Sequence, residues 1–315
     1  MTAAAVPLSR PRTSSGVDRV WTRFWFHPES AGNLALARIL VAAHALWVLA
    51  SRDYAAMSDV PQVFWRPSAA AIRWRYLIAP GHGDFERVLQ ALAVCALIGA
   101  LIGVAPRVCC AAAALLLYHL APLEAALWTG APEARGMTLA PTALLILAAS
   151  PSGNAYALWP RAQATSPTHQ APDYGWALLL IQMLVVEIYF FSAIGKVERT
   201  GLTWGSAERI RLWLFLFNQD PRSVVFGSLG PWMAGRAWIS ATIGLTTVVM
   251  EWMMPLALFW RRSRPVFIVV ALVFHAGVLL SMNIHVPEAW LILVLVDWTG
   301  LSQRLHRTPA TTQPA

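Results

Sequence analysis

The stretch YGWALLLIQMLVVEIYFFSAIGK, residues 174–196, decides the fold class. It is predominantly apolar and carries only two charged residues, Glu187 and Lys196. A helix needs about 20 predominantly apolar residues to cross the hydrocarbon core of a bilayer. The stretch therefore predicts a transmembrane helix with a polar edge.

Comparable runs lie on both sides of this stretch. Hydrophobic residues make up 57% of the chain and charged residues 13%, with sixteen tryptophans, which is too apolar for a soluble domain of this length. We predict an all-α fold, a polytopic transmembrane helical bundle with seven or eight spans. Interfacial helices are expected within residues 51–86 and 204–236, where aromatic and charged residues mix. The apolar runs are residues 34–50, 87–105, 108–122, 136–150, 174–195, 237–259, 265–282 and 289–301.

The domain organisation expected is one membrane domain, residues 19–301, between disordered tails at 1–18 and 302–315. Both tails are rich in Pro, Ser, Thr and Ala, and no cleavable signal peptide is apparent. The net charge of +8 is explained by arginines between spans, so nucleic acid is not an expected partner. Their distribution follows the positive-inside rule and predicts a multi-pass protein of the cell membrane with both termini cytoplasmic.

Lys196 is the only lysine in the chain, and the other cationic side chains are arginine. At 100° per residue, Gln182, Tyr189 and Ser192 share its helix face, so this polar stripe is expected to line a cavity between spans. A buried lysine can lose its proton and act as a base, whereas arginine stays charged. The alternative is a lysine that extends to the membrane surface beside Arg199 and Trp204.

Glu251 and His275 fall inside the sixth and seventh apolar runs, where ionisable groups are costly. They are expected to orient a reacting group, to hold a proton or to bond each other across helices. Pro255 lies four residues after Glu251 and is expected to open the helix there. Arg38, in the first run, is expected to extend to the inner membrane surface. The cysteines and histidines show no metal-binding spacing.

The stretch YFFSAIGKVERTGLTWG, residues 189–205, resembles the lysine region of the vitamin K-dependent γ-carboxylase membrane domain and of its bacterial relatives, the HTTM (horizontally transferred transmembrane) proteins. Four further stretches agree in order: LALARILVAAHALW, ILAASPSGNAYALW, IGLTTVVMEWMMPLALFW and VFHAGVLLSMNI. Together they cover about residues 20–300. The lysine stretch is fairly specific, and the others contribute through their order.

The resemblance implies that Lys196 is the base that deprotonates reduced vitamin K or another menaquinol-like quinol. We expect Glu251 and His275 to assist it and the cavity to be lined by Gln182, Tyr189, Ser192 and Trp204. It implies carboxylase-like lyase or oxidoreductase chemistry without a metal. Membrane lipids, a quinone and a soluble or membrane protein are the partners expected. The Asn-Asn-His loop of the carboxylases has no counterpart in TGAPEARGMTL, residues 129–139. Two alternatives remain: a non-catalytic lipid-binding accessory subunit, and a small proton-coupled transporter that uses His275 and Glu251.

Overall fold

The computed structural model describes residues 16–64, 81–127, 137, 139–159, 164–219, 226 and 228–306. Helices account for nearly all of its regular structure, which confirms the all-α prediction. In the described part of the chain the only sheet is an antiparallel pair, β1 (Glu29–Ser30) with β2 (Gln170–Ala171). This pair holds the start of the first long helix beside the start of the longest one.

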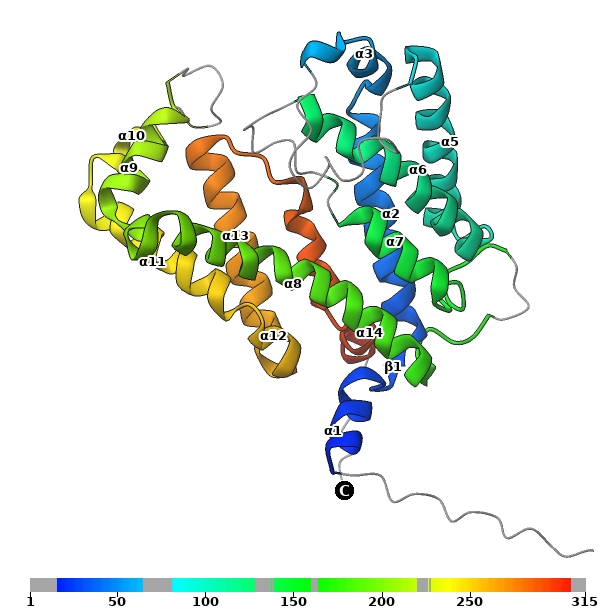
Figure 1. Cartoon of the computed structure of the whole chain (residues 1–315). Helices are drawn as coiled ribbons and strands as arrows, with labels where there is room; N and C mark the ends of the chain where they lie inside the picture. The colour runs from blue at the N-terminus through cyan, green and yellow to red at the C-terminus, as the bar shows by residue number, and fades with distance from the viewer. Residues whose placement is uncertain are drawn as a thin grey trace, which may run out of the picture.

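One half of the bundle packs around α2 (Ala31–Ala50), which is buried along most of its length. Its other members are α5 (Gly83–Ile102), α6 (Pro106–Leu127) and α7 (Ala140–Ala149). Figure 1 shows them side by side on the right. Ser30 caps α2, because its side chain accepts a hydrogen bond from the backbone amide of Asn33 at 3.1 Å. Small residues along α2 allow its neighbours to approach closely.

The other half contains α9 (Ala207–Leu216), α10 (Leu229–Ala234), α11 (Ala237–Met253), α12 (Leu256–Phe259) and α13 (Arg264–Met282). Between the halves, α8 (Pro172–Thr200) runs diagonally across the molecule (Figure 1). The 3₁₀ segment η5 (Pro287–Leu295) packs against α2, α8 and α13. Further 3₁₀ turns among the described residues are η1 (Gln62–Phe64), η3 (Gly201–Gly205) and η4 (Arg261–Ser263).

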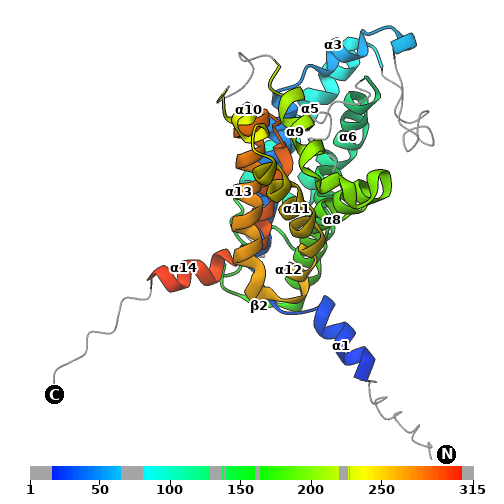
Figure 2. The same ribbon diagram turned by 90° about the vertical axis from the view of Figure 1, so that its left-hand side faces the viewer.

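Two short terminal helices, α1 (Gly16–Trp25) and α14 (Trp298–His306), extend from the same end of the bundle, while α3 (Tyr54–Ser58) and α10 lie at the opposite end (Figure 2). Both terminal helices reach into segments that the sequence assigns to tails. The remainder of the predicted tails, residues 1–15 and 307–315, lies outside the described residues.

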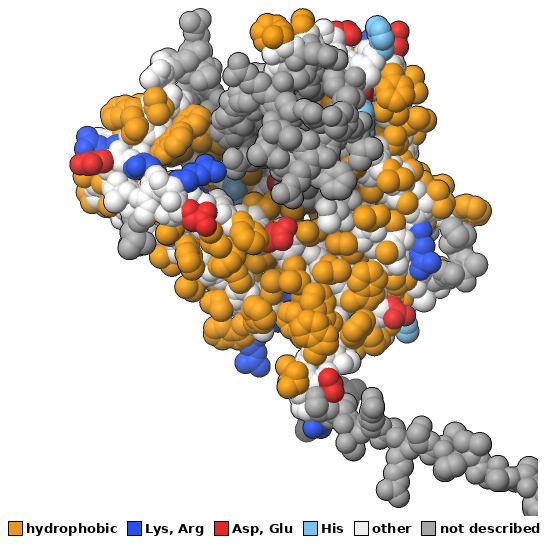
Figure 3. Space-filling model, viewed as in Figure 1, with side chains coloured by type: hydrophobic (Ala, Val, Ile, Leu, Met, Phe, Trp, Pro, Cys, Tyr) orange, Lys and Arg blue, Asp and Glu red, His pale blue; other side chains and the backbone are white. Residues whose placement is uncertain are grey.

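Five helices among the described residues are long and apolar enough to cross a membrane: Ala31–Ala50, Gly83–Ile102, Pro106–Leu123, Pro172–Thr200 and Arg261–Met282. The predicted count of seven or eight is therefore not confirmed. α7 and η5 are too short, and α11 ends at Met253 because the helix is interrupted before α12, as expected for Pro255. Hydrophobic side chains cover much of the surface between the two ends (Figure 3), as a lipid-facing surface requires.

Arg38 does not extend to the membrane surface, so that prediction is wrong. Its side chain is fully buried, and its guanidinium donates to the backbone carbonyls of Ser152 and Tyr156, both at 2.6 Å. These carbonyls belong to the turns that follow α7, where the chain leaves helical structure and its carbonyl groups need donors. Arg38 therefore closes the end of α7 against α2.

Candidate functional site

Lys196 lies in the second-last turn of α8, close to the point where that helix ends. The chain leaves α8 at Gly201, whose φ of 61° and ψ of −157° belong to a backbone region that is essentially restricted to glycine. This turn brings η3 back toward α8 and places the Trp204 ring 4.8 Å from the Lys196 ammonium nitrogen. An aromatic face at this distance stabilises a cation.

The Lys196 amine points at Glu251 of α11. Its Nζ lies 2.5 Å from both carboxylate oxygens of Glu251 and donates to the Ser192 hydroxyl at 2.8 Å. The Ser192 hydroxyl is 3.5 Å from Glu251 Oε1. The Lys196 side chain is 17% exposed and that of Glu251 5%. The site is therefore a buried ion pair in which the lysine is the member that can be reached from outside.

Glu251 bonds Lys196 and not His275. Instead, His275 Nε2 of α13 lies 3.0 Å from the Tyr189 hydroxyl of α8, and the two rings meet edge to face at 5.7 Å. His275 Nδ1 is buried and has no hydrogen-bond partner among the described residues. Tyr189 precedes Lys196 by about two helical turns. The two pairs thus follow one another along the same face of α8.

Gln182 is not part of this arrangement, although it shares the helix face. It lies about 21 Å from Lys196 along α8, at 1.5 Å per residue. Its amide donates to the Val294 carbonyl and accepts from Arg264, both at 3.0 Å. Gln182 lines a cavity at the other end of α8, and Lys196 is not among the residues that line it.

The sequence did not predict that the Lys196 amine is bound directly to a carboxylate. With its carboxylate partner the pair carries one exchangeable proton and no net charge, whether written as ammonium and carboxylate or as amine and acid. Either form can accept one further proton and become singly positive. The pair is therefore a proton acceptor that would attract the anion formed by its donor.

Two glycines hold this site together and were not recognised from the sequence. A Cβ atom on Gly244 of α11 would lie 2.5 Å from the carbonyl oxygen of Gly205 in η3. Only glycine at position 244 permits this approach of the two backbones. Gly244 precedes Glu251 by two turns on the same face of α11, so the contact sets Trp204 and Glu251 on either side of Lys196. Both glycines are visible in the sequence, but no local pattern pairs them.

Replacing Gly244 with alanine should separate η3 from α11 and lower the free energy of unfolding by about 1–3 kcal/mol, as overpacking does. Thermal unfolding of the detergent-solubilised protein measures the loss. Gly277→Ala is the matched control, because nothing lies within 4 Å of a Cβ atom on that helical glycine. An equal response to both substitutions would show that the contact between Gly205 and Gly244 is not a structural requirement.

Among the described residues, no group of three or more His, Cys, Asp or Glu side chains is arranged to hold a metal ion. The apolar helices and the buried ion pair define a multi-pass helical membrane protein. The sequence profile of the HTTM domain matches residues 26–297, and the chain belongs to this family. No curated protein and no solved structure matches the chain.

Proposed function

We propose that the protein performs acid–base chemistry on an apolar hydroxyl compound within the membrane, with Lys196 and Glu251 as one proton-accepting unit. The observation that carries the proposal is the buried contact between the Lys196 amine and both Glu251 oxygens. A buried ion pair is weak grounds for stability, since the desolvation of two charges offsets their attraction. Ionisable residues within spans are usually functional for this reason.

Reduced vitamin K or a related quinol is the compound that best fits the side chains around the pair. The unpartnered Nδ1 of His275 offers a hydrogen-bonding atom on the same side of α8, and Trp204 offers an aromatic face. Such a quinol, when bound, supplies an acidic hydroxyl group and two electrons. No metal is required for this chemistry.

The residues of the chain have separate roles in this proposal. The Lys196–Glu251 pair takes up the proton at its amine or carboxylate, and the resulting positive charge holds the anion beside it. Ser192 keeps the amine oriented, and Tyr189 orients His275. The subsequent reaction, carboxylation by a lyase or an oxidoreductase step, depends on a second substrate or a protein partner. We place the protein in the cell membrane with both termini cytoplasmic.

Lipids that copurify with the protein test the proposal. Organic extracts of the purified protein, examined by mass spectrometry, should contain a quinone that is enriched over a mock purification from the same membranes. Lys196→Met should reduce its amount, whereas Arg199→Met, a substitution of an exposed residue one turn further along α8, should not. Absence of any enriched quinone would contradict the proposal. Equal binding by all three proteins would favour an accessory lipid-binding subunit.

A further inference from the structure

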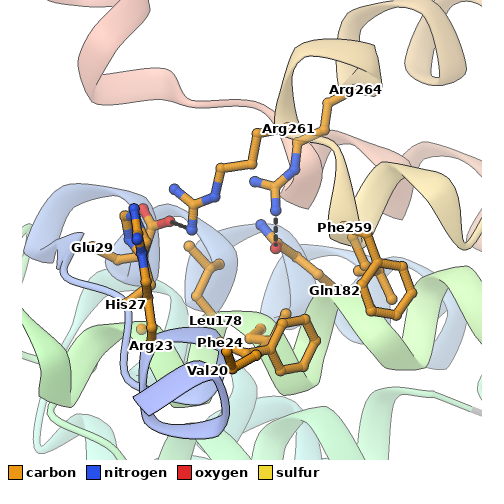
Figure 4. A pocket seen from close by; sticks show the side chains of 13 residues that line it. Val20, Arg23, Phe24, His27, Glu29, Leu178, Gln182, Phe259, Arg261 and Arg264 are labelled. Carbon is orange, nitrogen blue, oxygen red and sulfur yellow. Dashed lines mark hydrogen bonds and ion pairs between the residues drawn. The ribbon is translucent and has the colours of Figure 1, made fainter. Parts of the chain in front are cut away.

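One cavity of the molecule lies at the end that carries both terminal helices, away from Lys196. It has a volume of about 320 Å³ and lies between α1, the first half of α8 and the α12–α13 connection. Cavities of roughly 300–1,000 Å³ are typical of small-molecule sites. Figure 4 shows Arg261 and Arg264 side by side at its edge, with Arg23 and His27 on the facing segment.

Arg264 carries the main argument for a ligand. The residue is 8% exposed, and its guanidinium donates to two neutral oxygens, the Ala257 carbonyl and the Gln182 amide oxygen, both at 3.0 Å. No carboxylate among the described residues lies within ion-pair distance of it. A buried cation normally has an anionic partner, because desolvation is otherwise not compensated. Arg264 thus lacks a direct anionic partner, and the carboxylates of Glu29 and Asp297 act on it only from a greater distance.

The neighbouring charges reinforce this deficit. Arg261 is paired with Glu29 at 2.5 Å and is the only one of the three lining arginines with a carboxylate partner. Arg23 is exposed and makes no ion pair with the other described residues. Arg264 is also the first residue of α13, and the start of a helix attracts anions. Three guanidinium groups therefore line the cavity and only one of them is in an ion pair, an arrangement suited to a phosphate.

The rest of the cavity is apolar. Phe24 of α1 stacks on Phe259 of α12 with ring centroids 5.5 Å apart, and Val20, Leu178, Leu179 and Leu258 complete the lining. The outer face of α1 exposes Val17 and Trp21, at 77% and 62%. An apolar face on a short basic helix is typical of a segment lying in the membrane interface. The cavity thus combines cationic and apolar walls at the depth of lipid headgroups.

We propose that this cavity binds the phosphate of an anionic membrane phospholipid, with the guanidinium of Arg264 as the buried anchor, Arg23 and Arg261 at the mouth, and the aromatic pair against the first acyl carbons. The bound lipid joins α1 to α8 and α13. This site is separate from Lys196 and does not depend on the chemistry proposed there.

Native mass spectrometry of the full chain in detergent, with phosphatidylglycerol and phosphatidylcholine of identical acyl chains, tests the proposal. Phosphatidylglycerol should bind at least about tenfold more tightly, a difference of roughly 1.4 kcal/mol. Arg264→Gln and Arg23→Gln should each remove most of this preference. Arg262→Gln is the matched control, because Arg262 is exposed at the same end and does not line the cavity.

Arg23→Gln keeps the test decisive if Arg264→Gln does not fold, since Arg23 is exposed. If Arg262→Gln lost the preference for phosphatidylglycerol to the same extent, the lipid would be attracted to a basic surface in general, and the assignment would be overturned. Equal binding of the two lipids by the unmodified protein would overturn it as well. Competition with glycerol 3-phosphate distinguishes a lipid from a soluble phosphate. Glycerol 3-phosphate should not displace the lipid at millimolar concentration, and displacement would identify a soluble phosphate as the ligand instead.

Discussion

Replacing Lys196 with methionine is expected to destabilise the protein by about 3–5 kcal/mol, the usual cost of removing one partner of a buried ion pair. The Glu251 side chain is 5% exposed and would lose the Lys196 amine that lies 2.5 Å away. Its carboxylate would then be buried with neither a positive partner nor enough water to solvate it. Methionine fills a similar volume, so a cavity contributes little to this loss. Thermal unfolding in detergent, calibrated by chemical denaturation, measures it.

The second partner provides the control. In the double variant Lys196→Met with Glu251→Leu, both charges are absent and much of the stability should return, because a well-packed apolar pair often replaces a buried ion pair without loss. Arg199→Met, an exposed position on the same helix, should change stability by no more than about 0.5 kcal/mol. Equal effects at positions 196 and 199, with additive losses in the double variant, would contradict the pairing.

Replacing Lys196 with arginine is expected to lower quinol-dependent turnover by about 10²–10⁴-fold, the contribution usual for a general base, with little loss of stability. Arginine can keep its bond to Glu251, but its guanidinium does not release a proton in proteins. Oxygen uptake by the protein in nanodiscs with reduced vitamin K measures turnover. This result requires that the proton is held at the amine during the reaction.

The Lys196→Arg variant also distinguishes an enzyme from a transporter. Retained turnover in Lys196→Arg would assign the proton to Glu251 alone and remove the lysine from the reaction. The transporter would be favoured if neither the unmodified protein nor Lys196→Arg turned over the quinol, and if the protein carried out proton-coupled uptake of a solute. That uptake should be lost in His275→Gln or Glu251→Gln. Arg209→Lys on α9 serves as the reciprocal control, because the half-buried side chain there makes no contact with Lys196 or Glu251.

The sequence predicts the fold class because hydrophobic length is a local property. The run at 174–196 and its counterparts appear as helices, and the break at Pro255 follows from a single residue. The number of spans does not follow in the same way, since an apolar run such as 289–301 becomes the short 3₁₀ segment η5 instead of a long helix. Run length alone does not distinguish these outcomes.

Periodicity places side chains on one face of one helix but does not identify their partners on others. Tyr189, Ser192 and Lys196 share a face as predicted, yet the pairing of Lys196 with Glu251 and of Tyr189 with His275 depends on how α8, α11 and α13 cross. Gln182 shares the same face but lines a cavity far from Lys196, because α8 is long enough to reach both ends of the bundle. These pairings required the tertiary structure.

The single lysine of the chain allows the most direct test of the central claim. Incorporation of ¹⁵N-lysine gives one side-chain amine signal for the whole protein, and solid-state NMR in lipid bilayers can measure its dipolar coupling to ¹³C-labelled carboxyl carbons. We predict a short contact to one glutamate carboxyl, lost in Glu251→Gln, and a change in the amine signal when reduced vitamin K is added. A water-exposed ammonium signal that responds to neither change would contradict the account.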